Sequence, residues 1–136
     1  MNAKYTMICA GLLGMLAVAA GAFGAHGLEG RLGAQQLEWW QTAARYQVLH
    51  ALALLTLAWA RGPWTRLRRG AALALFVGVV IFSGTLYTMA LGAPRILGAV
   101  TPLGGLGMIA GWGMIAGLGL AMKGDETFPG GRESEG

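Results

Sequence analysis

Charged residues are scarce in this sequence. Only 12% of its 136 residues are Asp, Glu, Lys or Arg, whereas 55% are hydrophobic. A soluble domain carries about 25% charged residues, so the surface of a soluble fold of this size would remain largely uncovered. The scarcity excludes an ordinary soluble domain and indicates a protein of the lipid bilayer.

Residues that bind metals or form cross-links are also scarce. The single cysteine, Cys9, cannot form an internal disulfide and is interpreted as a packing residue. The two histidines, His26 and His50, have no carboxylate or thiolate at a matching spacing. The sequence contains no Ser-His-acid triad and no phosphate-binding glycine loop. We therefore expect no metal, no cofactor and no catalytic residue, and we interpret the protein as not an enzyme.

Apolar runs predict an all-α fold, a bundle of four transmembrane helices at about residues 5–25, 41–60, 71–91 and 102–122. Each run has roughly the 20 residues that cross a bilayer. Thr101 is expected as the N-cap of the last helix, with Pro102 at its first position. Residues 1–122 then form a single transmembrane domain, and the polar residues 123–136 form a mobile tail.

The connection between the first two runs contains residues that favour the membrane surface. Leu28, Leu32 and Trp39 lie roughly on one helical face, and Trp39 and Trp40 are typical interfacial aromatics. We expect a short interfacial helix here, although three nearby glycines disfavour it.

Basic residues are distributed unevenly along the chain. Four helices place both termini on one side of the membrane, and that side has seven cations, Lys4, Arg61, Arg66, Arg68, Arg69, Lys123 and Arg132. The other side has three, Arg31, Arg45 and Arg95. Cations accumulate on the cytoplasmic side. We therefore expect a multi-pass protein of a bacterial inner membrane with both termini cytoplasmic, and we assign the net charge of +4 to topology rather than to nucleic acid.

Polar residues at membrane depth are the candidate functional cluster. They are expected in the outer half of the membrane and comprise His26, Thr42, Arg45, Tyr46, Gln47, His50, Ser83, Tyr87 and Thr101. Thr42, Tyr46 and His50 are four residues apart and share a helical face. An ionisable residue inside the membrane suggests a functional site, whereas hydrogen bonds between helices give the same residues a structural role. We expect His50 to point into the bundle and to hydrogen-bond a group on another helix.

Small residues predict where helices approach closely. Helices in lipid associate through van der Waals packing, which glycine permits at short range. The predicted positions of tight packing are Gly14, Gly21, Gly107 and Gly111.

Several ordered motifs resemble a known family. They are GAFGAHGL at residues 21–28, Thr42-Ala43, Tyr46-Gln47, HALALL at 50–55, FSGTLY at 82–87, and TPLGG at 101–105 followed by Gly111-Trp112. Over about residues 5–122 the sequence resembles the small membrane proteins called domain of unknown function 423. The resemblance implies a four-helix membrane protein of bacteria, with relatives in mitochondria, and implies no known reaction.

Different functions remain open at this point. The first is a non-enzymatic protein that associates with itself or serves as an accessory subunit of a larger membrane complex. The alternative is a small oligomeric transporter or channel with a polar path near His50 and Tyr46. A lipid-modifying enzyme with His26 and His50 as acid and base is disfavoured. The expected partners are the lipid bilayer and a homo-oligomer or membrane complex.

Overall fold

The computed structural model describes residues 1–122, and the expected tail at 123–136 lies outside the described residues. The long helices are α1 (Ala3–His26), α2 (Ala34–Trp59), α3 (Arg66–Ala90) and α4 (Thr101–Ala121). A short 3₁₀ helix, η1 (Arg95–Ala99), precedes α4. The prediction of an all-α chain with four long helices is confirmed.

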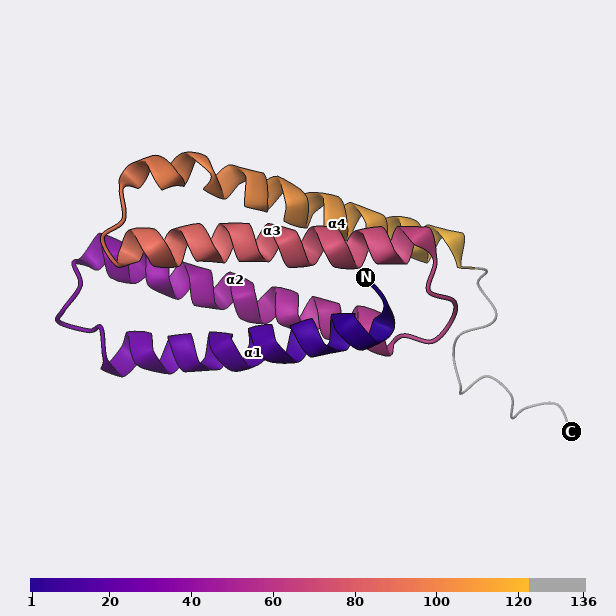
Figure 1. The fold of residues 1–136 in the computed structure, drawn as a ribbon, viewed down its shortest axis with the longest axis horizontal. Coiled ribbons are helices and arrows are strands. Elements are labelled where there is room, and N and C mark those ends of the chain that lie inside the picture. The colour runs from indigo at the N-terminus through magenta and orange to yellow at the C-terminus, as the bar shows by residue number, and fades with distance from the viewer. Residues whose placement is uncertain (123–136) are drawn as a thin grey trace, which may run out of the picture.

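The four helices lie side by side in chain order and alternate in direction (Figure 1). Extensive contacts join α1 to α2, α2 to α3 and α3 to α4, and within residues 1–122 no comparable contact joins α1 to α4. The N terminus, the α2–α3 connection and the end of α4 lie at one end of the molecule (Figure 1). The fold is therefore an open row with α2 and α3 in the middle, rather than a closed ring of helices.

The connection between α1 and α2 differs from the prediction. The expected short interfacial helix is wrong, because residues 27–33 form turns and bends and α2 already begins at Ala34. Gln36 stabilises this early start, since its Oε1 accepts a hydrogen bond from Gly33 N at 3.2 Å and its Nε2 donates to Ala90 O at 3.0 Å. Of the residues expected in a surface helix, Leu28 and Leu32 thus lie in the turns, and Trp39 lies in the second turn of α2.

The start of α4 also differs in detail. Helix α4 includes Thr101, and the residue before it, Val100, is the N-cap. The Thr101 hydroxyl does not cap the helix but lies 2.8 Å from the hydroxyl of Thr85 on α3. Pro102 lies in the first turn, where its missing N–H leaves no helical bond unmade.

Three segments of the described residues are long and apolar enough to cross a membrane, namely α1, α3 and Arg95–Ala121. Helix α2 is not among them because its first half contains polar and charged residues such as Gln36, Glu38 and Arg45. Its polar side chains that are buried, Gln47 and His50, face neighbouring helices rather than the surroundings.

The α3–α4 contact depends on glycines. A Cβ atom at Gly78 would lie 2.7 Å from Met108 N and 2.8 Å from Gly104 O, so the two backbones touch. Gly107 and Gly111 also lie against α3, with a Cβ at Gly111 meeting Leu75 at 2.6 Å. Dispersion between closely packed backbones joins helices in lipid. Two of the four glycines predicted to pack tightly, Gly107 and Gly111, lie at this α3–α4 contact.

The α1–α2 contact involves only one of the two glycines predicted for it. A Cβ at Gly14 would lie at an ordinary 3.8 Å from Ala51, whereas a Cβ at Gly21 would meet nothing within 4 Å. The prediction of tight packing at Gly21 is wrong, because the buried stripe repeats every seven residues through Ala10, Ala17 and Gly24. Gly24 is the close approach, since its Cβ would lie 2.7 Å from the Trp40 ring.

Candidate functional site

His50 links α2 to α4. Its side chain is only 5% exposed, and its Nδ1 lies 2.8 Å from Tyr46 O. Trp112 Nε1 lies 3.2 Å from His50 Nε2. The indole N–H can only donate, so Nε2 must accept, and Nδ1 then carries the proton that is donated to Tyr46 O. The expectation that His50 points inward and bonds another helix is confirmed, and the geometry requires the neutral Nδ1–H tautomer.

Tyr46 lies against this histidine and also contacts Phe82. The Tyr46 ring is stacked parallel to His50 with centroids 6.1 Å apart, and it contacts Phe82 of α3 with centroids 4.6 Å apart. Tyr46 itself is exposed. The imidazole therefore has aromatic neighbours and no charged residue as a hydrogen-bond partner.

A second group of polar side chains lies where α1, α2 and α3 meet. Gln47 Nε2 donates to Leu13 O at 2.9 Å, and Ser83 Oγ donates to Ala43 O at 2.9 Å. Both side chains are buried. Each one ties its helix to a backbone carbonyl of the neighbouring helix, where lipid offers no competing partner.

Trp40 strengthens the same region. Its Nε1 donates to Ala20 O at 2.8 Å, and its ring lies edge-on against Tyr87 with centroids 4.6 Å apart. Sequence reasoning assigned Trp40 to a membrane-surface helix and gave Trp112 no role. A usable signal was the seven-residue step from Trp40 to Gln47, which places both on one face of α2.

The hydroxyl of Tyr87 is buried without a hydrogen-bond partner among the described residues. A buried unpaired donor of this kind is unfavourable by about 1–3 kcal/mol. The Tyr87 ring also lines a cavity of about 350 Å³ between α1 and α3, together with Gln47 and Ser83. That volume lies near the lower end of the range for small-molecule sites, about 300–1,000 Å³, but most of its lining is apolar.

The remaining candidates lie apart from these groups. His26 is exposed at the end of α1, Arg45 is exposed, and Thr42 is half-buried. Thr101 pairs with Thr85 at the α3–α4 contact. The candidate cluster is thus divided among separate helix contacts, and residues 1–122 contain no group of histidine, cysteine and acidic side chains that could hold a metal ion.

Arg68 is a buried cation that sequence reasoning counted only as a topology signal. Its side chain is 6% exposed, and its guanidinium donates to Leu57 O, to Ala60 O at 2.5 Å and to Gly62 O at 3.2 Å. It also lies 4.3 Å from the centre of the Trp64 ring. These carbonyls belong to the last turn of α2 and the following loop, where a helix leaves carbonyl groups unpaired and presents partial negative charge.

The family comparison covers His50, Gln47, Ser83 and Arg68, whereas their partners Leu13 and Trp112 lie outside the matched residues. The model of a protein of unknown function, DUF423, matches residues 20–105. A UPF0382 membrane protein of Staphylococcus epidermidis is 46% identical over 93 residues, which are 68% of this chain and 76% of the relative. The UPF0382 inner membrane protein YgdD of Escherichia coli is 39% identical over 103 residues, 71% of this chain and 74% of the relative. No solved structure matches the chain.

Proposed function

We propose that this chain, which belongs to the DUF423 family of membrane proteins, is a non-enzymatic protein that associates with copies of itself or with a larger membrane complex. The chain is an integral membrane protein. Its Escherichia coli relative is named an inner membrane protein, which supports the same location for this chain. The observation that carries the proposal is that the buried side chains of His50, Gln47 and Ser83 form hydrogen bonds within the protein.

Three buried polar side chains within the helices are occupied by internal hydrogen bonds, whereas the Tyr87 hydroxyl has no partner among the described residues. His50, Gln47 and Ser83 each bind a group on a neighbouring helix or on their own backbone. A general acid or base must reach a substrate proton within hydrogen-bond distance. Because both ring nitrogens of His50 are already engaged, their geometry supports a structural role rather than a catalytic one.

The edges of the row support association. Outward residues of α1 and α4 are large and apolar, and the most exposed include Val18, Met15, Ile109 and Leu120. Open glycines accompany them, since a Cβ at Gly11 or Gly113 would meet nothing within 4 Å. Such faces allow a further helix to approach closely, and both edges of an open row can accept one.

We further propose that all four helices cross the membrane, with both termini in the cytoplasm. Helix α2 has 26 residues, which span about 39 Å at 1.5 Å per residue. It lies antiparallel between α1 and α3, two segments of membrane-spanning length and composition. The excess of cations at the end with the N terminus and the α2–α3 loop supports a cytoplasmic location for that end.

The alternative, a small oligomeric transporter or channel, has the cavity beside Tyr87 and Gln47 in its favour. The neutral, fully bonded His50 speaks against a proton relay through that residue. A transporter requires measurable solute flux, whereas an accessory or self-associating protein does not.

Measuring the size of the purified full chain and its solute flux distinguishes the associating protein from the transporter. The protein would be extracted in a mild detergent, its mass measured by light scattering, and its co-purifying proteins identified. We expect a homo-oligomer or a stoichiometric complex, with no ion or solute flux after reconstitution into vesicles. A monomer without partners would contradict the association, and flux above that of empty vesicles would favour the transporter.

A further inference from the structure

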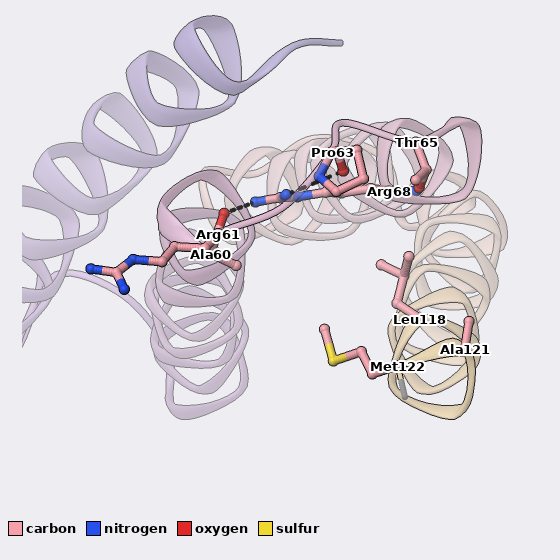
Figure 2. Close-up of a pocket in the computed structure, with 8 residues that line it drawn as sticks. All are labelled: Ala60, Arg61, Pro63, Thr65, Arg68, Leu118, Ala121 and Met122. Carbon is pink, nitrogen blue, oxygen red and sulfur yellow. Dashed lines mark hydrogen bonds between the residues drawn. The ribbon is translucent and has the colours of Figure 1, made fainter. Parts of the chain in front are cut away.

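A hollow of about 240 Å³ lies at the end of the molecule that carries the α2–α3 loop. Its lining comprises Ala60, Arg61, Pro63, Thr65, Arg68, Leu118, Ala121 and Met122. Figure 2 shows loop residues and Arg68 on one side and the last turns of α4 on the other, with the side chains of Leu118 and Met122 directed into the space between them. One wall is therefore cationic and polar, and the opposite wall is apolar.

Among the residues that the structure describes, the charge around this hollow is positive. Four arginines lie between residues 61 and 69, and three of them, Arg61, Arg66 and Arg69, are exposed. The two acidic residues of the described chain, Glu29 and Glu38, lie at the opposite end of the row. Exposed cations next to the membrane surface attract anionic lipid by about 1 kcal/mol each.

The guanidinium of Arg68 forms part of the wall of the hollow, but its N–H groups are not free to bind a ligand. All three of its nitrogens already donate to carbonyls of α2 and the loop. Its charge remains, because carbonyl groups do not neutralise a cation. Thr65 and Arg61 also line the hollow and are both exposed, although Figure 2 shows the guanidinium of Arg61 directed away from α4. Neither side chain is enclosed, so their donors are accessible to an anion.

We propose that the hollow binds one anionic phospholipid. The phosphate lies at Thr65, next to the charge of Arg68, and the exposed side chain of Arg61 turns toward it. An acyl chain packs on Leu118, Ala121 and Met122. The apolar wall distinguishes this ligand from a free phosphate, which would gain nothing from those side chains. The site is independent of the proposed association, because it requires neither a second copy nor a larger complex.

The test compares lipids with identical acyl chains on the full-length protein in mild detergent. Phosphatidylglycerol and phosphatidylcholine would be titrated, and bound lipid would be counted by native mass spectrometry, with inorganic phosphate as a third ligand. We expect one phosphatidylglycerol to bind at least about fivefold more tightly than phosphatidylcholine, the factor that about 1 kcal/mol provides. We expect inorganic phosphate not to compete at the same concentration.

Single variants then locate the site. Arg61→Gln should weaken phosphatidylglycerol binding about fivefold, and Ala121→Phe should block the acyl chain while all charges remain. Arg31→Gln is the matched control, because Arg31 is also exposed but lies at the other end. Far-ultraviolet circular dichroism would verify that each variant is folded. If Ala121→Phe does not fold, the lipid affinity of Arg61→Gln alone tests the site.

Several results would overturn the lipid site. Equal affinity for the two lipids, or equal loss in Arg31→Gln and Arg61→Gln, would reduce the effect to general charge. Competition by inorganic phosphate would make the site one for a free anion. Binding that appears only when Asp125, Glu126, Glu133 and Glu135 are replaced by their amides would assign the hollow to the chain's own acidic segment.

Discussion

The indole N–H of Trp112 donates a hydrogen bond to Nε2 of His50, at 3.2 Å. This bond joins α4 to α2, although these two helices are not successive in the row and α3 contacts both of them. Because the other ring nitrogen donates to Tyr46 O, the imidazole has no free hydrogen-bonding site. The pair therefore links two helices that are not successive in the row, whereas the other contacts of the row join successive helices.

We predict that His50→Leu lowers stability by about 1–3 kcal/mol, because it leaves the Trp112 N–H without an acceptor. His50→Gln should retain most of the stability, since an amide can both accept and donate. Thermal unfolding in detergent measures both, and Trp112→Phe provides the second single variant of a double-mutant cycle. Additive effects of His50→Leu and Trp112→Phe would show that the bond contributes nothing.

Gly78→Leu should separate α3 from α4. A side chain at residue 78 meets the backbone of α4 at 2.7–2.8 Å, and neither backbone can move without losing the other contacts. Gly21→Leu is the matched control, because residue 21 has open space around it. We expect a large loss of thermal stability for Gly78→Leu and little change for Gly21→Leu, and the reverse order would refute the α3–α4 packing.

Arg68→Met should destabilise the α2–α3 connection by about 1.5–3 kcal/mol, the value of hydrogen bonds to a charged group. The methionine preserves the apolar stem but leaves the last carbonyls of α2 unpaired. Arg69→Met removes the same charge from an exposed neighbour and should have little effect. Limited proteolysis of the loop, with chemical denaturation of both variants, would reveal the difference, and similar behaviour of the two would mean that Arg68 is only a topology signal.

Two hydroxyl deletions at the α1–α3 cavity should differ in sign. Tyr87→Phe removes an unpaired buried hydroxyl, so stability should be unchanged or higher. Ser83→Ala removes the donor to Ala43 O and should lower stability by about 0.5–1.5 kcal/mol. A loss of stability in Tyr87→Phe would reveal a partner for that hydroxyl, and melting temperatures of the two variants suffice for the comparison.

The proposed topology predicts opposite accessibility of the two ends. On a Cys9→Ala background, single cysteines at Glu29 and Arg66 should react with a membrane-impermeant thiol reagent from opposite sides of the membrane. In whole cells only the cysteine at residue 29 should be labelled, and in inverted vesicles only the one at residue 66. Labelling of both from the same side would contradict four crossings.

The sequence by itself determined the class of the protein, the number of long helices and the family. Scarce charge and apolar runs of bilayer length leave few alternatives to membrane helices, and motifs such as HALALL at 50–55 and TPLGG at 101–105 identified the DUF423 family correctly. The inward direction of His50 was also predictable, because an imidazole facing lipid would be unfavourable.

Only the tertiary structure decided which faces touch. Helices α1 and α4 are apolar on all sides, so their sequences do not reveal a buried stripe, and Gly21 resembles Gly24 until the Trp40 ring is placed against one of them. Four neighbouring arginines look alike in sequence, yet one is buried because the last turn of α2 presents its carbonyls to residue 68. Hydrogen bonds between residues far apart in the chain, as between Trp112 and His50, arise from helix placement, which local periodicity does not encode.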